Sequence, residues 1–276
     1  MTPRGRTPVA LTIAGSDSGG GAGIQADLKA FARSGVHGAS AIVALTAQNT
    51  VGVTAIHPVP PQMILDQVRA VSSDLGVDAV KIGMLADEGT IEAVVRALGE
   101  LGEAPTVVDP VMIAESRAVL LDPEAKTALI ERVLPIATVA TPNLPEAREL
   151  TGMGESADPA ELARAVHALG PRYAVVTGGH SGEGTDFFFD GESVVAIRGP
   201  KHPEGATHGS GCTHSSVLAA HLALGMEPLE AARAARAIAA EAVAAGMREL
   251  GVGAGPVDAL RVSRRRPDAG GGGDGD

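Results

Sequence analysis

The only cysteine of the chain lies in the segment THGSGCT at 207–213, where glycine and serine residues lead directly into Cys212. An alanine- and leucine-rich pattern follows from about His214 to Leu224 and predicts a helix. A small turn at a helix start points several backbone N–H groups at one place, and the helix dipole adds a positive potential there. The segment therefore predicts a site for an anion such as phosphate, with a thiol beside it.

The residue types leave three roles open for Cys212. A helix N-terminus lowers the pKa of a thiol and raises its thiolate content, so Cys212 could be a general base or a nucleophile, or else an inert thiol. A nucleophile needs a neighbouring base with an orienting partner. His208 is a candidate base, but no orienting carboxylate is evident near it in the sequence. The spacing of His208, Cys212 and His214 disfavours zinc, because no second Cys–His pair has ligand spacing.

A glycine-rich segment, GSDSGGGAG at 15–23, follows the apolar run Val9–Ala14. Its part GAGIQA at 21–26 imitates the fingerprint of dinucleotide-binding proteins, which also needs an acidic residue at the end of the second strand. The second apolar run ends instead in TAQN at 46–49, and no glycine is followed by lysine, as a Walker A motif requires. We therefore expect this loop to let a small substrate approach the backbone.

Short β-branched runs alternate with helical patterns along the chain. This alternation predicts βαβ units, and hence an α/β fold with a mainly parallel central sheet and helices on both faces. A run of Phe residues, Asp190-Gly191 and a second apolar run predict a small antiparallel hairpin at one edge. We expect one domain over residues 8–262 and a disordered tail over 263–276. The predicted strands are 9–14, 41–46, 79–82, 106–108, 138–140, 173–177, 187–189 and 193–197, and the predicted helices are 24–32, 63–75, 90–101, 123–133, 145–151, 159–169, 214–224 and 228–249.

Polar and glycine residues stand where these strands end. Ligands of open parallel sheets bind beyond the carboxyl ends of the strands, so we expect these residues to meet at one site. Asp109 and Glu146 could hold Mg²⁺ through water beside a phosphate, although each alone is equally an ordinary turn or early-helix acid. Asp27 lies in the first turn of a helix and could accept hydrogen bonds from an amine or a hydroxyl group. The strand-end set is Gly15, Gln48, Gly83, Met84, Asp109, Pro110, Asn143, Gly178 and Gly179.

The composition excludes several classes of function. The chain has 276 residues, a formal net charge of −11, 2% aromatic residues and no Trp. These values disfavour binding to a nucleic-acid backbone or to stacked bases, but they leave a nucleotide and a small molecule as partners. No apolar run is long enough for a membrane span or for the core of a signal peptide, and a single cysteine forms no internal disulfide. We therefore expect a soluble cytoplasmic protein.

These motifs together resemble the bacterial hydroxymethylpyrimidine/phosphomethylpyrimidine kinases of thiamine biosynthesis, a family with the ribokinase-like fold. The resemblance runs from about Ala10 to Val257. It implies ATP-dependent phosphorylation of 4-amino-5-hydroxymethyl-2-methylpyrimidine and then of its monophosphate, with Mg²⁺, in a homodimer; the need for a monovalent cation stays open. The matching segments are LTIAGSDSGGGAGIQADLK (11–29), TAQNT (46–50), KIGML (81–85), DPVM (109–112), TPNLPE (141–146), GGH (178–180) and HGSGCT (208–213).

The resemblance also implies a role for individual residues. Cys212 would take the proton of the substrate hydroxymethyl group as a general base, and Asp109 and Glu146 would organise Mg²⁺ and the ATP phosphates. Asp27 and Gln48 would read the edge of the aminopyrimidine ring. The same pocket would be lined by Gly15, Met84 and Val111. The nucleotide would be bound by Asn143, Glu146, Thr177 and Gly179. The transferring phosphoryl group would be stabilised by Gly209, Ser210 and Gly211.

Two departures from the family pattern concern the delivery of phosphate. Thr177 stands where many members have Lys, and Glu115 stands where many have Lys in a flap over the substrate. These changes weaken the expectation of the second phosphorylation more than that of the first. Arg117 is a candidate to replace the lost cation.

Two other functions remain alternatives. Pyridoxal kinase activity is the closer one, because pyridoxal shares the combination of a ring and a hydroxymethyl group. Some relatives carry a second cysteine in the flap for pyridoxal, and this chain has only Cys212. A non-catalytic regulator that binds a pyrimidine or a nucleotide is the alternative from another class.

Overall fold

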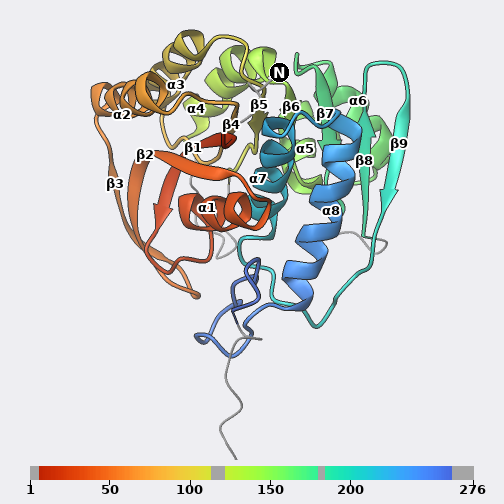
Figure 1. The fold of residues 1–276 in the computed structure, drawn as a ribbon. Coiled ribbons are helices and arrows are strands. Elements are labelled where there is room, and N and C mark those ends of the chain that lie inside the picture. Colours follow the sequence, from red (N-terminus) through yellow and green to blue (C-terminus); the bar gives the residue numbers. More distant parts are fainter. Residues whose placement is uncertain (1–5, 113–121, 180–183, 263–276) are drawn as a thin grey trace, which may run out of the picture.

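The computed structural model describes residues 6–112, 122–179 and 184–262. In these segments nine strands form one sheet: β1 (Val9–Asp17), β2 (His37–Gln48), β3 (Val53–Pro58), β4 (Ala79–Ile82), β5 (Thr106–Val108), β6 (Val139–Ala140), β7 (Tyr173–Val176), β8 (Thr185–Phe189) and β9 (Val194–Arg198). Their order is β3-β2-β1-β4-β5-β6-β7-β8-β9 (Figure 1). The strands from β2 to β7 in this order are parallel, whereas β3 at one edge and β8 and β9 at the other are antiparallel.

Helices cover both faces of this sheet (Figure 1). They are α1 (Gly23–Arg33), α2 (Pro61–Asp74), α3 (Glu88–Leu101), α4 (Pro123–Ala128), α5 (Leu144–Thr151), α6 (Pro159–His167), α7 (Ser210–Ala223) and α8 (Pro228–Ala244), with the short turns η1 (Leu129–Val133) and η2 (Leu134–Ile136) after α4. Helices α1, α7 and α8 pack on one face around Phe31 and Leu218. Helices α2 to α6 pack on the other face around Ile64 and Leu162.

Helix α7 is the most deeply enclosed helix among the described residues. From Thr213 to Ala220 every side chain is buried, because the helix contacts α1, α8, β1, β4 and β5. Small and apolar side chains at these positions allow the close approach on all sides. The start of α7 at Ser210 is consequently held in a fixed position relative to the strand ends.

The predicted α/β architecture with an antiparallel edge hairpin is confirmed. The hairpin of β8 and β9 is joined by the residues 190–193, longer than a two-residue Asp-Gly turn, and the Asp190 carboxylate accepts hydrogen bonds from the backbone N–H groups of Glu192 and Ser193. Helix α7 begins at Ser210, before the predicted start at about His214, so that Gly211 and Cys212 lie inside its first turn.

The sequence patterns missed β3, which pairs antiparallel with β2 at the sheet edge. Most of its side chains are exposed, so the strand carries none of the alternation that marks a half-buried strand. Its partner β2 also extends beyond the predicted end to Gln48, past the helices that cover the sheet (Figure 1). The end of β2 from Leu45 to Gln48 and the strand β3 form a ribbon in which most side chains are exposed or half-buried.

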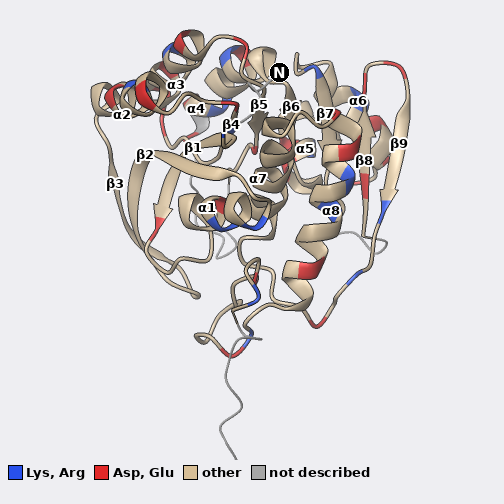
Figure 2. Cartoon of the chain, in the orientation of Figure 1, with Lys and Arg blue, Asp and Glu red and all other residues tan. Residues whose placement is uncertain are grey.

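Charged residues are spread over the molecule rather than gathered. Figure 2 shows Lys and Arg interspersed with Asp and Glu along the outer helices and loops. Over the described residues, the ribbon positions of Lys and Arg do not gather on one element as they do in many nucleic-acid-binding proteins. Among the residues that the structure describes, none of the helices combines the length and apolar character needed to cross a bilayer.

Candidate active site

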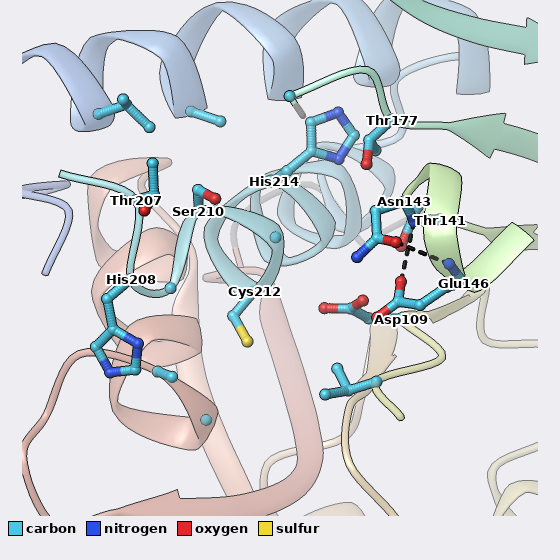
Figure 3. A pocket seen from close by; sticks show the side chains of 18 of the residues that line it. Asp109, Thr141, Asn143, Glu146, Thr177, Thr207, His208, Ser210, Cys212 and His214 are labelled. Carbon is cyan, nitrogen blue, oxygen red and sulfur yellow. Dashed lines mark hydrogen bonds between the residues drawn. The ribbon is translucent and has the colours of Figure 1, made fainter. Parts of the chain in front are cut away.

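A cavity of about 400 Å³ opens at the carboxyl ends of the parallel strands, against the start of α7 (Figure 3). The strand ends supply its floor and α7 supplies one wall, as expected for a sheet of this class. Nearly all of the predicted site residues meet there. The cavity is lined by Gly15, Gln48, Met84, Asp109, Val111, Asn143, Glu146, Thr177, Gly179, Gly209, Ser210, Gly211 and Cys212.

Asp27, which the resemblance assigns to the edge of the substrate ring, is the exception. Its side chain is fully buried in α1 and does not line the cavity. Its oxygens accept hydrogen bonds from Thr12 Oγ1 (2.6 Å) and Ser216 Oγ (2.7 Å), and they pair with Lys81 Nζ (2.9 Å). Asp27 is therefore part of the support beneath the site.

The turn before α7 has the conformation that an anion site needs. Gly209 lies in the left-handed region with φ of 83°, and a Cβ atom there would overlap with the carbonyl oxygen of Gly21. Among the described residues no side chain caps the first turn of α7, although the backbone N–H of Ser210 donates to the carbonyl oxygen of Thr207 (2.9 Å). A Cβ atom at Gly211 would meet nothing within 4 Å. The first turn therefore leaves room for an anionic group beside Cys212.

The structure reverses the expected direction of the pKa shift at Cys212. Burial, the largest cause, together with the charges of Asp109 and Asp27, raises the pKa of this thiol to about 12. The ammonium group of Lys81 and a hydrogen bond from the backbone N–H of Gly23 lower the pKa but do not outweigh these effects. Cys212 is thus a thiol at neutral pH in the ligand-free protein, in spite of its place at a helix N-terminus.

Asp109 and Glu146 face one another across the floor of the cavity (Figure 3). Burial and the neighbouring Asp109 charge raise the pKa of Glu146 to about 8. Glu146 also forms a capping box with Asn143: each side chain accepts a hydrogen bond of 2.9 Å from the other's backbone N–H. The Glu146 side chain therefore caps α5 and also lines the cavity, so the two roles predicted for it do not exclude one another.

The orienting carboxylate that the sequence did not reveal for His208 is Asp17. His208 Nε2 lies 3.1 Å from Asp17 Oδ2, although the residues are 191 positions apart. Burial opposes ionisation of Asp17, but the hydrogen bonds from His208 and from the backbone N–H groups of Ala22 and Gly19 lower its pKa overall. In Figure 3 the His208 ring lies to one side of the Cys212 side chain, and its Nε2 is engaged by Asp17. His208 fastens the glycine loop to the turn before α7 and is not placed as a base for Cys212.

A second histidine–carboxylate pair, also missed by the sequence patterns, borders the cavity near Thr177. His214 Nε2 lies 3.1 Å from Asp186 Oδ2, while Asp186 Oδ1 accepts a hydrogen bond from the backbone N–H of Gly178 (2.9 Å). Arg236 from α8 donates to the carbonyl oxygens of Gly184 (2.6 Å) and Pro200 (3.0 Å). These contacts join α7, α8 and β8.

Three residues named in the sequence analysis lie outside the described residues. They are Glu115, Arg117 and His180.

The chain matches the family model of phosphomethylpyrimidine kinase over residues 17–258. It is 50% identical to a hydroxymethylpyrimidine/phosphomethylpyrimidine kinase of Rhizobium meliloti, over 91% of this chain and 96% of that protein. A crystal structure of phosphomethylpyrimidine kinase from Clostridium difficile is similar at 41% identity with a TM-score of 0.74, covering 83% of this chain and 96% of that one. Pyridoxal kinase of Bacillus subtilis, solved as an ADP complex, has a TM-score of 0.85 at 38% identity, covering 93% and 99% of the two chains.

Proposed function

The chain belongs to the phosphomethylpyrimidine kinase family, and we propose that it transfers the γ-phosphoryl group of ATP to 4-amino-5-hydroxymethyl-2-methylpyrimidine and then to the resulting monophosphate, in the formation of thiamine diphosphate. One observation above all supports this function. An uncapped helix start with Cys212 in its first turn faces two carboxylates across a cavity of about 400 Å³. Phosphoryl transfer requires little more than this positioning and charge stabilisation.

The residues of the cavity divide into a ring end and a phosphate end. Gln48, with Gly15, Met84 and Val111, would hold the pyrimidine ring. The amide oxygen of Gln48 accepts a hydrogen bond from Thr46 (3.0 Å), an orientation in which the amide nitrogen is the group to donate to a ring nitrogen. The nucleotide would be held at the other end by Asn143, Glu146, Thr177 and Gly179.

Cys212 would act as the general base at the reacting hydroxyl. The hydroxyl proton passes to the sulfur while the oxygen forms its new bond to the γ-phosphorus and the bond from that phosphorus to ADP breaks. The turn formed by Gly209, Ser210 and Gly211 would stabilise the phosphoryl oxygens during the transfer, through backbone N–H groups other than that of Ser210, which donates to the carbonyl oxygen of Thr207. Because the pKa of Cys212 is about 12, the thiol has to release its own proton to solvent before it can accept the proton of the hydroxyl group.

Asp109 and Glu146 fit a Mg²⁺ ion. Burial and, next to it, the charge of Asp109 raise the pKa of Glu146, and a divalent cation relieves both the desolvation and the repulsion of the two carboxylates. Mg²⁺ commonly binds through one or two carboxylates and keeps water and substrate phosphates as its other ligands. When bound, the ion would neutralise charge on the ATP phosphates; Asp109 and Glu146 would orient it directly or through water.

Replacing Glu146 by Gln is expected to stabilise the metal-free protein increasingly as the pH rises. The pKa of Glu146 is raised from 4.5 to about 8, so the wild type loses stability as the pH rises through this window, and the neutral amide does not. Gln retains an oxygen for the capping box. We expect equal melting temperatures of the two proteins near pH 4 and a higher melting temperature for the variant at pH 9. The difference should be about 2–4 °C for each kcal/mol of difference in the free energy of unfolding.

Calorimetry in EDTA would measure this difference, and Glu149→Gln provides the control, because Glu149 is an exposed residue of the same helix. Equal melting temperatures of Glu146→Gln and the wild type across the range would contradict the assignment. Adding Mg²⁺ and ATP should give the wild type the higher melting temperature, because ligand binding then stabilises the wild type more than the variant.

The function itself is tested by measuring ADP release with Mg²⁺, ATP and each of three acceptors: the hydroxymethylpyrimidine, its monophosphate and pyridoxal. We expect turnover of both pyrimidines. The absence of ADP with both of them would refute the proposal. Faster turnover of pyridoxal would favour the second candidate function, which is pyridoxal kinase activity. The 38% identity to a pyridoxal kinase supports testing this candidate.

We also propose that the protein is a homodimer working in the cytoplasm. The ribbon of β2 and β3 carries Leu45 and Ile56, which are 47% and 41% exposed, with Val51 close by in the connecting turn. Exposed apolar side chains on a projecting edge are a common sign of an interface. The double variant Leu45→Glu/Ile56→Glu should halve the mass measured by light scattering. Leu224→Glu, at an exposed apolar residue elsewhere, should leave it unchanged.

A further inference from the structure

A lysine and an aspartate are completely buried beneath the cavity, and the mechanism above uses neither. Lys81 projects from β4 and Asp27 from α1, and both side chains have an exposed fraction of 0%. The ammonium nitrogen lies 2.9 and 3.0 Å from the two carboxylate oxygens of Asp27. Burying such a pair is costly, and the pair by itself is weak evidence for stability. Its position relative to Cys212 suggests a different use.

The pair is fixed to the helix that carries Cys212. Ser216 Oγ donates to Asp27 Oδ1 (2.7 Å), and Ser216 stands four positions after Cys212, so the two side chains share one face of α7. A second serine of α7 connects the helix to the same group of charged side chains. Ser215 Oγ donates to Asp109 Oδ2 (3.1 Å), and that oxygen lies 4.0 Å from the ammonium nitrogen of Lys81. Lys81 also lines the cavity together with Cys212. The ammonium group thus lies beneath the first turn of α7.

The charges around the sulfur make this position consequential. Asp27 faces it from α1 and Asp109 from the end of β5, with Glu146 of α5 beside Asp109 and His214 following on α7. Lys81 is the cation from β4 that faces these groups. Burial lowers the pKa of Lys81, but Asp27, Cys212 and Asp109 together raise it above its ordinary value, so the ammonium keeps its charge. Without Lys81, the charges of Asp27 and Asp109 would oppose a thiolate at Cys212, and the backbone N–H of Gly23 would be left to stabilise it.

We propose that Lys81 is a positioning residue for Cys212: its ammonium group, held in place by Asp27, stabilises the negative charge that the sulfur carries as a thiolate, before it accepts the substrate proton. The proposal rests on the proposed function of Cys212 as the base. Its physical content, an electrostatic effect of Lys81 and Asp27 on the thiol, exists in the free protein and is measurable without turnover.

The probe is iodoacetamide, a neutral reagent that reacts with the thiolate. Cys212 is the only cysteine, so the whole alkylation rate of the native protein reports on this sulfur. Each unit of change in the thiol pKa alters the thiolate fraction tenfold at pH 8. A less basic thiolate is also a weaker nucleophile, so we expect a net change of about threefold for each unit.

Two variants distinguish charge from structure, because both break the same buried pair. Lys81→Met removes the cation, so we expect Cys212 to be alkylated at least about threefold more slowly than in the wild type. Asp27→Asn removes an anion and should make alkylation faster by a similar factor. Disruption of the fold would move both rates in the same direction. Two changes in the same direction, or no change in either, would overturn the proposal.

Lys126→Met is the matched control, since it removes a lysine from an exposed ion pair with Glu149 and should not alter the alkylation rate. Circular dichroism and a melting curve would show that each variant is folded. If Lys81→Met fails to fold, the double variant Lys81→Met/Asp27→Asn replaces it, because it leaves no unpaired charge. Its alkylation rate should then fall clearly below that of Asp27→Asn, and equal rates would overturn the proposal. Failure of the kinase assay together with opposite shifts in alkylation would refute the proposed function and leave the electrostatic effect established.

Discussion

Replacing Cys212 by Ala is expected to lower the rate of phosphoryl transfer by about 10²–10⁴-fold, the range associated with loss of a general base. The methyl group of alanine fits where the thiol lies, and the N–H groups of the first turn of α7 remain. The binding of ATP should therefore be retained. Single-turnover measurements of ADP formation, with ATP affinity measured by calorimetry, would separate these two effects.

Cys212→Ser is the informative companion variant. A hydroxyl group has nearly the size of the thiol but is a far poorer acid, so the serine variant should stay close to the alanine variant in rate. Retention of most of the wild-type rate in both variants would contradict the role of Cys212 as a base. A loss of ATP affinity as large as the loss of rate would show that the sulfur is needed for binding instead.

Replacing Gly209 by Ala is expected to have the second large effect. The residue has φ of 83°, and the added Cβ atom would overlap with the carbonyl oxygen of Gly21. The turn before α7 has to shift, and the N–H groups that stabilise the transferring phosphoryl group shift with it. Loss of such a preorganised donor costs about 10²–10³-fold in rate. The expected result is a lower kcat with little change in the KM of the pyrimidine.

Gly225→Ala is the matched control at the other end of the same helix. Gly225 has φ of 80°, close to that of Gly209, but a Cβ atom there would meet nothing within 4 Å. Both variants carry the strain of a left-handed alanine, so their difference isolates the overlap with Gly21. Equal losses of rate in the two variants would show that the effect is general destabilisation.

The central part of the fold could be predicted from the sequence because its strands are buried on both faces. The predicted bounds of the runs Ala79–Ile82 and Thr106–Val108 are those of β4 and β5, and every residue of both strands is buried, including Lys81 and Thr106. Strand β3 could not be found in this way, since it buries almost nothing and is held by backbone pairing with β2. The start of α7 was placed too late because Gly211 and Ser210 are poor helix formers taken alone.

The candidate site could be predicted as a set of positions but not as a network of contacts. The rule that ligands bind at the carboxyl ends of parallel strands brings together Gly15, Asp109 and Asn143, and these residues line the cavity. The partners of Asp27, Asp17 and Asp186 depend on which helix faces which strand. Such contacts join residues up to 191 positions apart, and no local pattern encodes them. The raised pKa of Cys212 has the same origin, because burial depends on the packing around α7.

The contacts between the glycine loop at 15–23 and the turn before α7 limit how this enzyme can vary or be redesigned. A side chain at Gly209 would meet Gly21, and a side chain at Gly21 would meet the ring of His208. Neither Gly21 nor Gly209 can accept a larger residue unless the other segment yields, so substitutions at these two positions are not independent. A library that randomises one loop alone would return mostly inactive variants. Exchange of either segment with a relative should succeed only when both are exchanged together.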